Sequence, residues 1–118
     1  LGDKAPRIFQ VNWFRKGEDG RFLWPGFGEN SRVLAWIVDR VAGRAGAVDA
    51  PTGRMPEAGD LPLDGLDLPE ADLAELFEVP VAAWRAEADD TETFFAEFGQ
   101  QVPAALYDQL TALRQRLG

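Results

Sequence analysis

The chain has 118 residues, of which 46% are hydrophobic and 11% aromatic, so it can bury one modest core and global disorder is not expected. It contains no Cys and no His, which excludes disulfides, thiolate nucleophiles, imidazole bases and the usual zinc ligand sets. The net charge is −8, with +3 on residues 1–54 and −11 on residues 55–118. The second half would repel a polyanion, whereas the first half could accept one compact anion such as a nucleotide.

The hydropathy and the first residues bear on location. No apolar run approaches the roughly 20 residues that a membrane-spanning helix needs, and the start lacks both a charged leader and an apolar signal core. We therefore expect a soluble protein with no membrane partner, and predict the cytoplasm as its location. The chain begins with Leu1 rather than Met, which we interpret as a piece of a longer chain or a processed product.

The first predicted element is a β-hairpin. The run Arg7–Phe14 is rich in β-branched and aromatic residues and partly alternates, which predicts a strand. Asp19 and Gly20 then give a strong turn signal, because glycine can adopt the positive φ that such turns require. The return strand is predicted over Arg21–Trp24 and ends before Pro25.

A glycine-rich loop is predicted over residues 25–31, with Phe27 between two glycines. A helix should begin at Asn30 or Ser31, since both are good N-cap residues, and end at Gly43. Its predicted apolar face consists of Val33, Leu34, Ile37, Val38 and Val41. The loop therefore holds an aromatic ring at the N-terminus of a helix.

Residues 43–69 mix Gly, Pro, Ala and Asp with short apolar pairs, which favours an ordered excursion over a surface rather than a helix or a flexible linker. Three helices are predicted to follow, over residues 69–77, 80–98 and 103–117, each beginning with a proline in the first turn.

Two tryptophans and one acidic run have structural interpretations. Trp36 and Trp84 are expected in the core. An acidic run on the second of these helices is expected to be a solvated face, with an oxygen-only metal site as the less favoured alternative. It consists of Glu87, Asp89, Asp90 and Glu92.

The predicted fold class is α+β. Residues 1–42 form a hairpin, a glycine-rich loop and a helix, and residues 43–118 form a surface excursion and a C-terminal helical subdomain. We interpret the whole as one contiguous partial domain.

The candidate site is a group of aromatic rings with one amide in the first part of the chain. A planar base could stack on such rings for about 1–3 kcal/mol per base, and a carboxamide can donate to and accept from a base edge. The residues concerned are Trp13, Phe14, Phe22, Phe27 and Asn30. Composition and spacing leave a second interpretation open, in which the rings are ordinary core and Asn30 is an ordinary N-cap.

One sequence segment favours the first of these interpretations. The sequence Phe-Leu-Trp-Pro-Gly-Phe-Gly-Glu-Asn-Ser-Arg-Val-Leu at positions 22–34, preceded by Val-Asn-Trp-Phe-Arg-Lys at 11–16, closely resembles the guanine-binding segment of GTP-dependent phosphoenolpyruvate carboxykinases. The resemblance continues more weakly over essentially the whole chain. The weaker matches are Pro51-Thr52-Gly53, Leu63-Asp64-Gly65-Leu66, Ala74-Glu75-Leu76-Phe77, Trp84 and Leu113-Arg114-Gln115-Arg116-Leu117.

The resemblance implies a fold, a reaction and roles for these residues. The family interconverts oxaloacetate and phosphoenolpyruvate, with release of carbon dioxide, using GTP and Mn²⁺ or Mg²⁺, in gluconeogenesis. The chain would be a C-terminal fragment of such a carboxy-lyase, a partial C-terminal domain of its fold. By resemblance, Phe14, Phe22 and Phe27 enclose guanine, Trp13 lies beside them, and Asn30 makes the polar contact that favours guanine over adenine.

The chain has no counterpart of the family's glycine-rich phosphate loop with its Lys and Thr, its reactive Cys, its metal ligands, its substrate-binding arginines or its mobile lid. We therefore assign no catalytic residue and no metal ligand to these 118 residues. Phosphoryl transfer depends on metal ions and positioned cations, so the fragment alone is expected to be inactive and to bind GTP weakly, if at all. The expected partners are a guanine nucleotide and the remainder of the enzyme.

Two other function classes stay open. In the first, exposed aromatic rings form an apolar patch that drives dimerisation, as in a non-enzymatic interaction module. In the second, the rings bind single-stranded nucleic acid, which the charge of −8 disfavours. Arg15 and Lys16 are expected to keep the hairpin soluble, with attraction of phosphate as the alternative.

Overall fold

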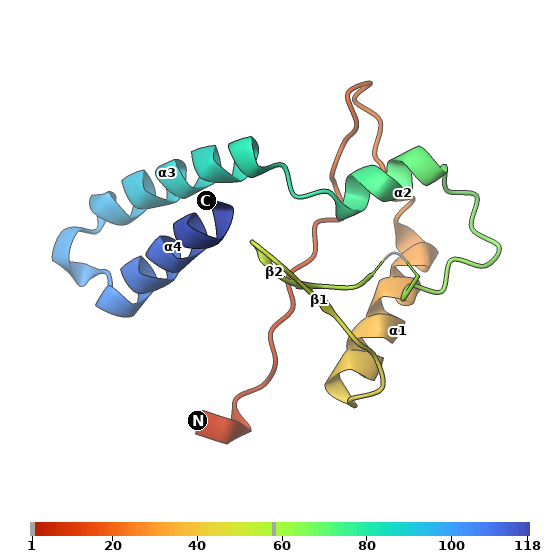
Figure 1. Ribbon diagram of the computed structural model, residues 1–118, viewed down its shortest axis with the longest axis horizontal. Coiled ribbons are helices and arrows are strands. Elements are labelled where there is room, and N and C mark those ends of the chain that lie inside the picture. The colour runs from red at the N-terminus through yellow and green to blue at the C-terminus, as the bar shows by residue number, and fades with distance from the viewer. Residues whose placement is uncertain (1, 58) are drawn as a thin grey trace. The chain divides into compact units, whose positions relative to one another are not determined.

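The computed structural model describes residues 2–57 and 59–118, and its order of elements is shown in Figure 1. The described residues form two compact units. The first comprises those up to Val48 and from Met55 to Glu78, and the second comprises Asp49–Arg54 and Val79–Gly118. The α-helices are α1 (Asn30–Val41), α2 (Glu70–Phe77), α3 (Val81–Glu97) and α4 (Ala104–Leu117). Short 3-10 helices cover Gly2–Lys4, Phe27–Glu29 and Gly99–Gln101.

The predicted N-terminal hairpin is confirmed only at its turn. Gly20 has φ 77°, and the two arms pair in an isolated antiparallel bridge between Lys16 and Phe22. The strand predicted over Arg7–Phe14 is wrong, because that run pairs with no strand among the described residues. At the end of this run, Oδ1 of Asn12 accepts the N–H of Phe14 at 3.0 Å. This N–H therefore bonds to a nearby side chain and not to the backbone of a second strand.

Helix α1 forms where it was predicted, but not with the predicted cap. Asn30 is the first helical residue, and Glu29 occupies the N-cap position without a side-chain cap. The hydroxyl of Ser31 donates to the carbonyl of Gly28 at 2.7 Å, so it does not cap either. The interpretation of Asn30 as an ordinary N-cap is therefore wrong.

The excursion contains a two-stranded sheet that the sequence did not predict. Strands β1 (Val48–Ala50) and β2 (Gly53–Met55) are joined by Pro51 and Thr52, and a two-residue connection makes the pair antiparallel. Each strand has only three residues, which is too short for an alternating pattern to be recognised.

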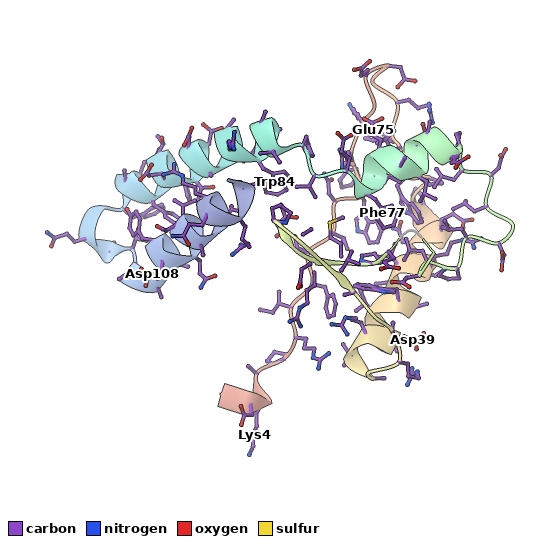
Figure 2. The ribbon with its side chains drawn as sticks, viewed as in Figure 1. Lys4, Asp39, Glu75, Phe77, Trp84 and Asp108 are labelled. Carbon is purple, nitrogen blue, oxygen red and sulfur yellow. The ribbon has the colours of Figure 1, made fainter. Side chains whose placement is uncertain are left out.

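The core of the first unit lies directly after the hairpin. Leu23 and Trp24 are buried, and the buried Trp36 of α1 packs at a right angle to Phe9, with ring centroids 6.1 Å apart. Phe77 points from α2 into the packed side of the same unit (Figure 2). The Trp36 prediction is confirmed.

Most of the second unit is a helical hairpin of α3 and α4 (Figure 1). Ala88, Leu110 and Leu117 are buried in it, and Phe95 packs edge-on against Tyr107 at 5.4 Å. Trp84 is about one-third exposed, so its prediction as a core residue is wrong.

Ends and charges of these helices differ slightly from expectation. Each of the three later helices begins one residue after the predicted proline, which occupies the N-cap position; these prolines are Pro69, Pro80 and Pro103.

Part of the acidic run on α3 is paired: Arg114 of α4 lies 2.6 Å from Asp89 and 2.9 Å from Glu92.

Candidate functional site

The hairpin brings two of the predicted site rings together. Phe14 and Phe22 pack edge to face with centroids 6.1 Å apart and planes at 65°. Although they contact each other, Phe14 is 72% and Phe22 50% exposed. The Nζ atom of Lys16 lies 5.1 Å from the centre of the Phe22 ring, a cation–π distance. The pair is therefore a surface feature and not part of the core.

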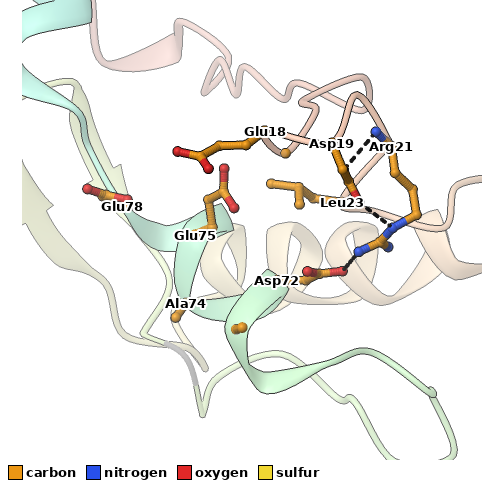
Figure 3. A pocket seen from close by; sticks show the side chains of 10 residues that line it. Glu18, Asp19, Arg21, Leu23, Asp72, Ala74, Glu75 and Glu78 are labelled. Atoms are coloured by element: carbon orange, nitrogen blue, oxygen red, sulfur yellow. Dashed lines mark hydrogen bonds and ion pairs between the residues drawn. The ribbon is translucent and has the colours of Figure 1, made fainter.

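An ion pair fastens this hairpin to α2. Arg21 lies between Asp19 and Asp72 in Figure 3, with its guanidinium 2.8 Å from the Asp72 carboxylate and 3.4 Å from that of Asp19. The hydrogen bond to Asp72 raises the pKa of Arg21. The backbone N–H of Arg21, donated to Oδ1 of Asp19 at 3.0 Å, lowers the pKa of the Asp19 carboxyl. The turn is thus locked both internally and to its neighbouring helix.

Arg15 supplies a second anchor for the same hairpin. Its guanidinium donates to the carbonyl of Glu78 at 2.9 Å and to that of Leu76 at 3.5 Å, at the C-terminal end of α2. Those carbonyls have no partner within a helix, so this bond caps α2. Arg15 is therefore structural, in contrast to the predicted solubilising surface cation.

Phe27 stands apart from the ring pair. Its side chain is 96% exposed, and its φ of 46° is the only positive value at a non-glycine residue in the described part of the chain. One backbone hydrogen bond spans Phe27, since the N–H of Glu29 donates to the carbonyl of Gly26 at 3.1 Å. Arg32 adds a link, donating to Glu29 and to carbonyls of the segment at Pro62 and Asp64. No contact joins Phe27 to Phe14 or Phe22.

Asn30 is held by a residue that the sequence analysis did not assign to the site. The indole Nε1–H of Trp24 donates to Oδ1 of Asn30 at 2.8 Å. Trp24 is 6% exposed, so a core residue fixes the side chain of a site residue. The only sequence signal for this pair is the spacing of six residues across the glycine-rich loop, which predicts no contact by itself.

Two cavities lie in the first unit. Trp13, which is half-buried, and Trp24 line a small apolar one of about 150 Å³, together with side chains of α1 and α2. The larger, about 820 Å³, lies between the hairpin and α2. Glu18, Glu75 and Glu78 line it, and this acidic wall does not suit an anionic nucleotide (Figure 3).

Within residues 2–57 and 59–118, no group of three or more His, Cys, Asp or Glu side chains could hold a metal ion. Within the same described residues, none of the helices combines the length and the apolar character needed to cross a membrane.

Comparison with known proteins agrees with the resemblance. Residues 1–116 match the family model of the phosphoenolpyruvate carboxykinase C-terminal P-loop domain. The phosphoenolpyruvate carboxykinase [GTP] of Corynebacterium efficiens is 50% identical over 116 residues, which are 98% of this chain and 19% of that protein. Its namesake from Neocallimastix frontalis is 50% identical over 115 residues, 97% of this chain and 19% of the relative. The chain thus spans 19% of the length of these relatives, and it belongs to the GTP-dependent phosphoenolpyruvate carboxykinase family.

Proposed function

We propose that this chain is the guanine-recognising part of a GTP-dependent phosphoenolpyruvate carboxykinase. The observation that carries the proposal is Phe27, a large apolar ring that is 96% exposed and held at φ 46°. An L-residue in this region costs roughly 1–2 kcal/mol, and burial of the ring recovers none of that cost. A strained, exposed aromatic ring is accounted for when a ligand covers it.

The site divides affinity and selectivity between different side chains. Phe14, Phe22 and Phe27 offer apolar faces on which a purine of either kind would stack. Trp13 is placed beside them along the chain and is half-buried. Asn30 supplies hydrogen bonds that discriminate between bases, since a wrong base leaves a polar group unpaired.

The catalytic activity is proposed for the intact enzyme and not for this chain. That reaction converts oxaloacetate and GTP to phosphoenolpyruvate, GDP and carbon dioxide, with Mn²⁺ or Mg²⁺, in the cytoplasm. The 118 residues contain no phosphate loop of the form G-x-x-x-x-G-K-[S/T], and the described residues contain no metal-binding cluster. The chain alone is therefore proposed to be inactive, with the rest of the enzyme as its partner.

Ligand-observed NMR with GTP and ATP tests the recognition role. The unaltered chain should give a weak saturation-transfer signal that is stronger for GTP, and Phe27→Ala should reduce it. Because Phe27 makes no core contact, that variant should keep the free energy of unfolding within about 0.5 kcal/mol.

Phe94→Ala is the matched control, since Phe94 is an exposed ring on α3 in the other unit. It should leave the GTP signal unchanged. Equal signals for GTP and ATP in the unaltered chain, or an equal loss in both variants, would contradict the proposal.

Self-association is the second candidate, and one observation favours it. Ile8, Phe14 and Phe27 of the first unit are at least 72% exposed, which is unusual for large apolar side chains. Sedimentation velocity over a hundredfold range of concentration should then show a dimer that Phe27→Ala weakens. A monomer at every concentration would remove this candidate.

A further inference from the structure

We infer that Trp24 is a positioning residue for base selectivity: its indole fixes the orientation of the Asn30 carboxamide, and this orientation decides which purine edge can bind. The inference rests on the proposed guanine recognition and deepens it, because it names a residue that sets selectivity without touching the base.

The chemistry of the contact determines which way the amide faces. An indole N–H can only donate, so the partner at 2.8 Å must be the carbonyl oxygen of Asn30 and not its NH₂ group. Rotating the amide by half a turn would bring two donors together and break the bond. The Nδ2 group, with its two donors, is therefore directed away from Trp24.

The scaffold around the bond is rigid. Trp24 is 6% exposed and follows Leu23, which is 2% exposed, so its ring cannot turn to follow the amide. Asn30 is the first residue of α1, and the preceding turn fixes its backbone. Trp24 is thus held by the packing of the core, and Asn30, which is partly buried, by its place in the first turn of α1.

The two purines differ at the atoms that such an amide reads. Guanine presents O6, an acceptor, where adenine presents N6, a donor. An amide whose NH₂ group is fixed can bind O6, but it meets N6 as donor against donor. To bind adenine, the Asn30 amide would have to rotate by half a turn, and this rotation would break its hydrogen bond with Trp24. Selectivity thus depends on a buried tryptophan behind Asn30.

The test replaces one atom. Incorporation of 3-benzothienylalanine at position 24 keeps the shape of the indole and substitutes sulfur for the N–H. We expect the ratio of GTP to ATP affinity, measured by ligand-observed NMR on the full chain, to fall about five- to tenfold. The fall should come with unchanged or tighter ATP binding, which a merely structural defect would not produce.

Two controls separate the outcomes. The same replacement at Trp36, also buried but bonded to no polar group among the described residues, should leave the ratio unchanged. Asn30→Ala should abolish the preference. A preference that disappears in Asn30→Ala but persists with the altered residue at 24 would overturn this inference and leave guanine recognition intact. No guanine preference in the unaltered chain would overturn both.

Discussion

Trp36 and Trp24 offer a matched pair for testing how polar burial affects stability. Both are 6% exposed, but the Nε1–H of Trp24 donates to Asn30, whereas that of Trp36 has no partner among the described residues. Trp36→Phe keeps a ring that can still pack against Phe9 and removes the unpaired donor. We predict that it is far better tolerated than Trp24→Phe.

The magnitudes follow from two terms. Trimming a buried indole to a phenyl ring costs about 1–2 kcal/mol of apolar burial and packing. At Trp36 this is offset by about 1–3 kcal/mol, because a buried donor without a partner is removed, so the free energy of unfolding should change by between a loss of about 1 kcal/mol and a gain of about 2 kcal/mol. At Trp24 the lost hydrogen bond adds about 0.5–1.5 kcal/mol, for a total loss of about 1.5–3.5 kcal/mol.

Urea denaturation followed by far-ultraviolet circular dichroism measures both variants on the same footing. The transition midpoint should rise or fall only slightly for Trp36→Phe and fall clearly for Trp24→Phe, with similar slopes. If Trp36→Phe destabilises the chain as much as Trp24→Phe, the reasoning on the unpaired donor is refuted.

Three more predictions concern the hairpin and the loop. Leu23→Ala, at a residue only 2% exposed, should lower the free energy of unfolding by about 2–5 kcal/mol, and a loss below 1 kcal/mol in urea would contradict its place in the core. Gly26→Ala should lower the free energy of unfolding by roughly 1–2 kcal/mol, because φ at Gly26 is 80°. Gly28→Ala, at a position with open space and no positive φ, should change it by no more than about 0.5 kcal/mol. Equal urea midpoints for the two variants would contradict this prediction. The pKa of the Asp19 carboxyl is lowered, so its contribution to stability is complete above the ordinary value of 3.8 and is lost as the pH falls through the lowered value. A titration of this carboxyl by NMR with a midpoint at or above 3.8 would contradict the prediction.

Helices were predictable because their signals are local. The apolar spacing and the stop at Gly43 gave α1, and the prolines marked the starts of the three later helices to within a residue. The turn at Gly20 was equally local, since a positive φ at glycine needs no distant partner.

Pairing between segments was much less predictable. The run Arg7–Phe14 has the composition of a strand, but a strand requires a partner, and the side chain of Asn12 diverts the chain before one is reached. The short strands β1 and β2 were missed for the opposite reason. The turn at Pro51 brings them together, although the composition of neither strand predicts one.

The candidate site shows the same division. The residue types of Phe14, Phe22 and Phe27 indicated exposed stacking surfaces once the resemblance was recognised. Their support was invisible in the sequence, because the anchoring of Arg21 on Asp72 joins positions 51 residues apart. The guanine contacts themselves stay a prediction.

Arginine, in this acidic chain, is used mainly on uncharged partners. Seven of the ten arginines donate to backbone carbonyls in the described residues, among them Arg15 at the end of α2 and Arg32 at the segment near Asp64. A carbonyl neither titrates nor attracts a cloud of counterions, so added salt weakens these links far less than it weakens a surface ion pair. Lysine, a single ammonium without the planar fork, could not reach two carbonyls at once in the same way. The segments that these arginines hold should therefore keep their conformation at high salt concentration and at high pH. Under the same conditions, segments held by ion pairs between lysine and carboxylate would become less ordered.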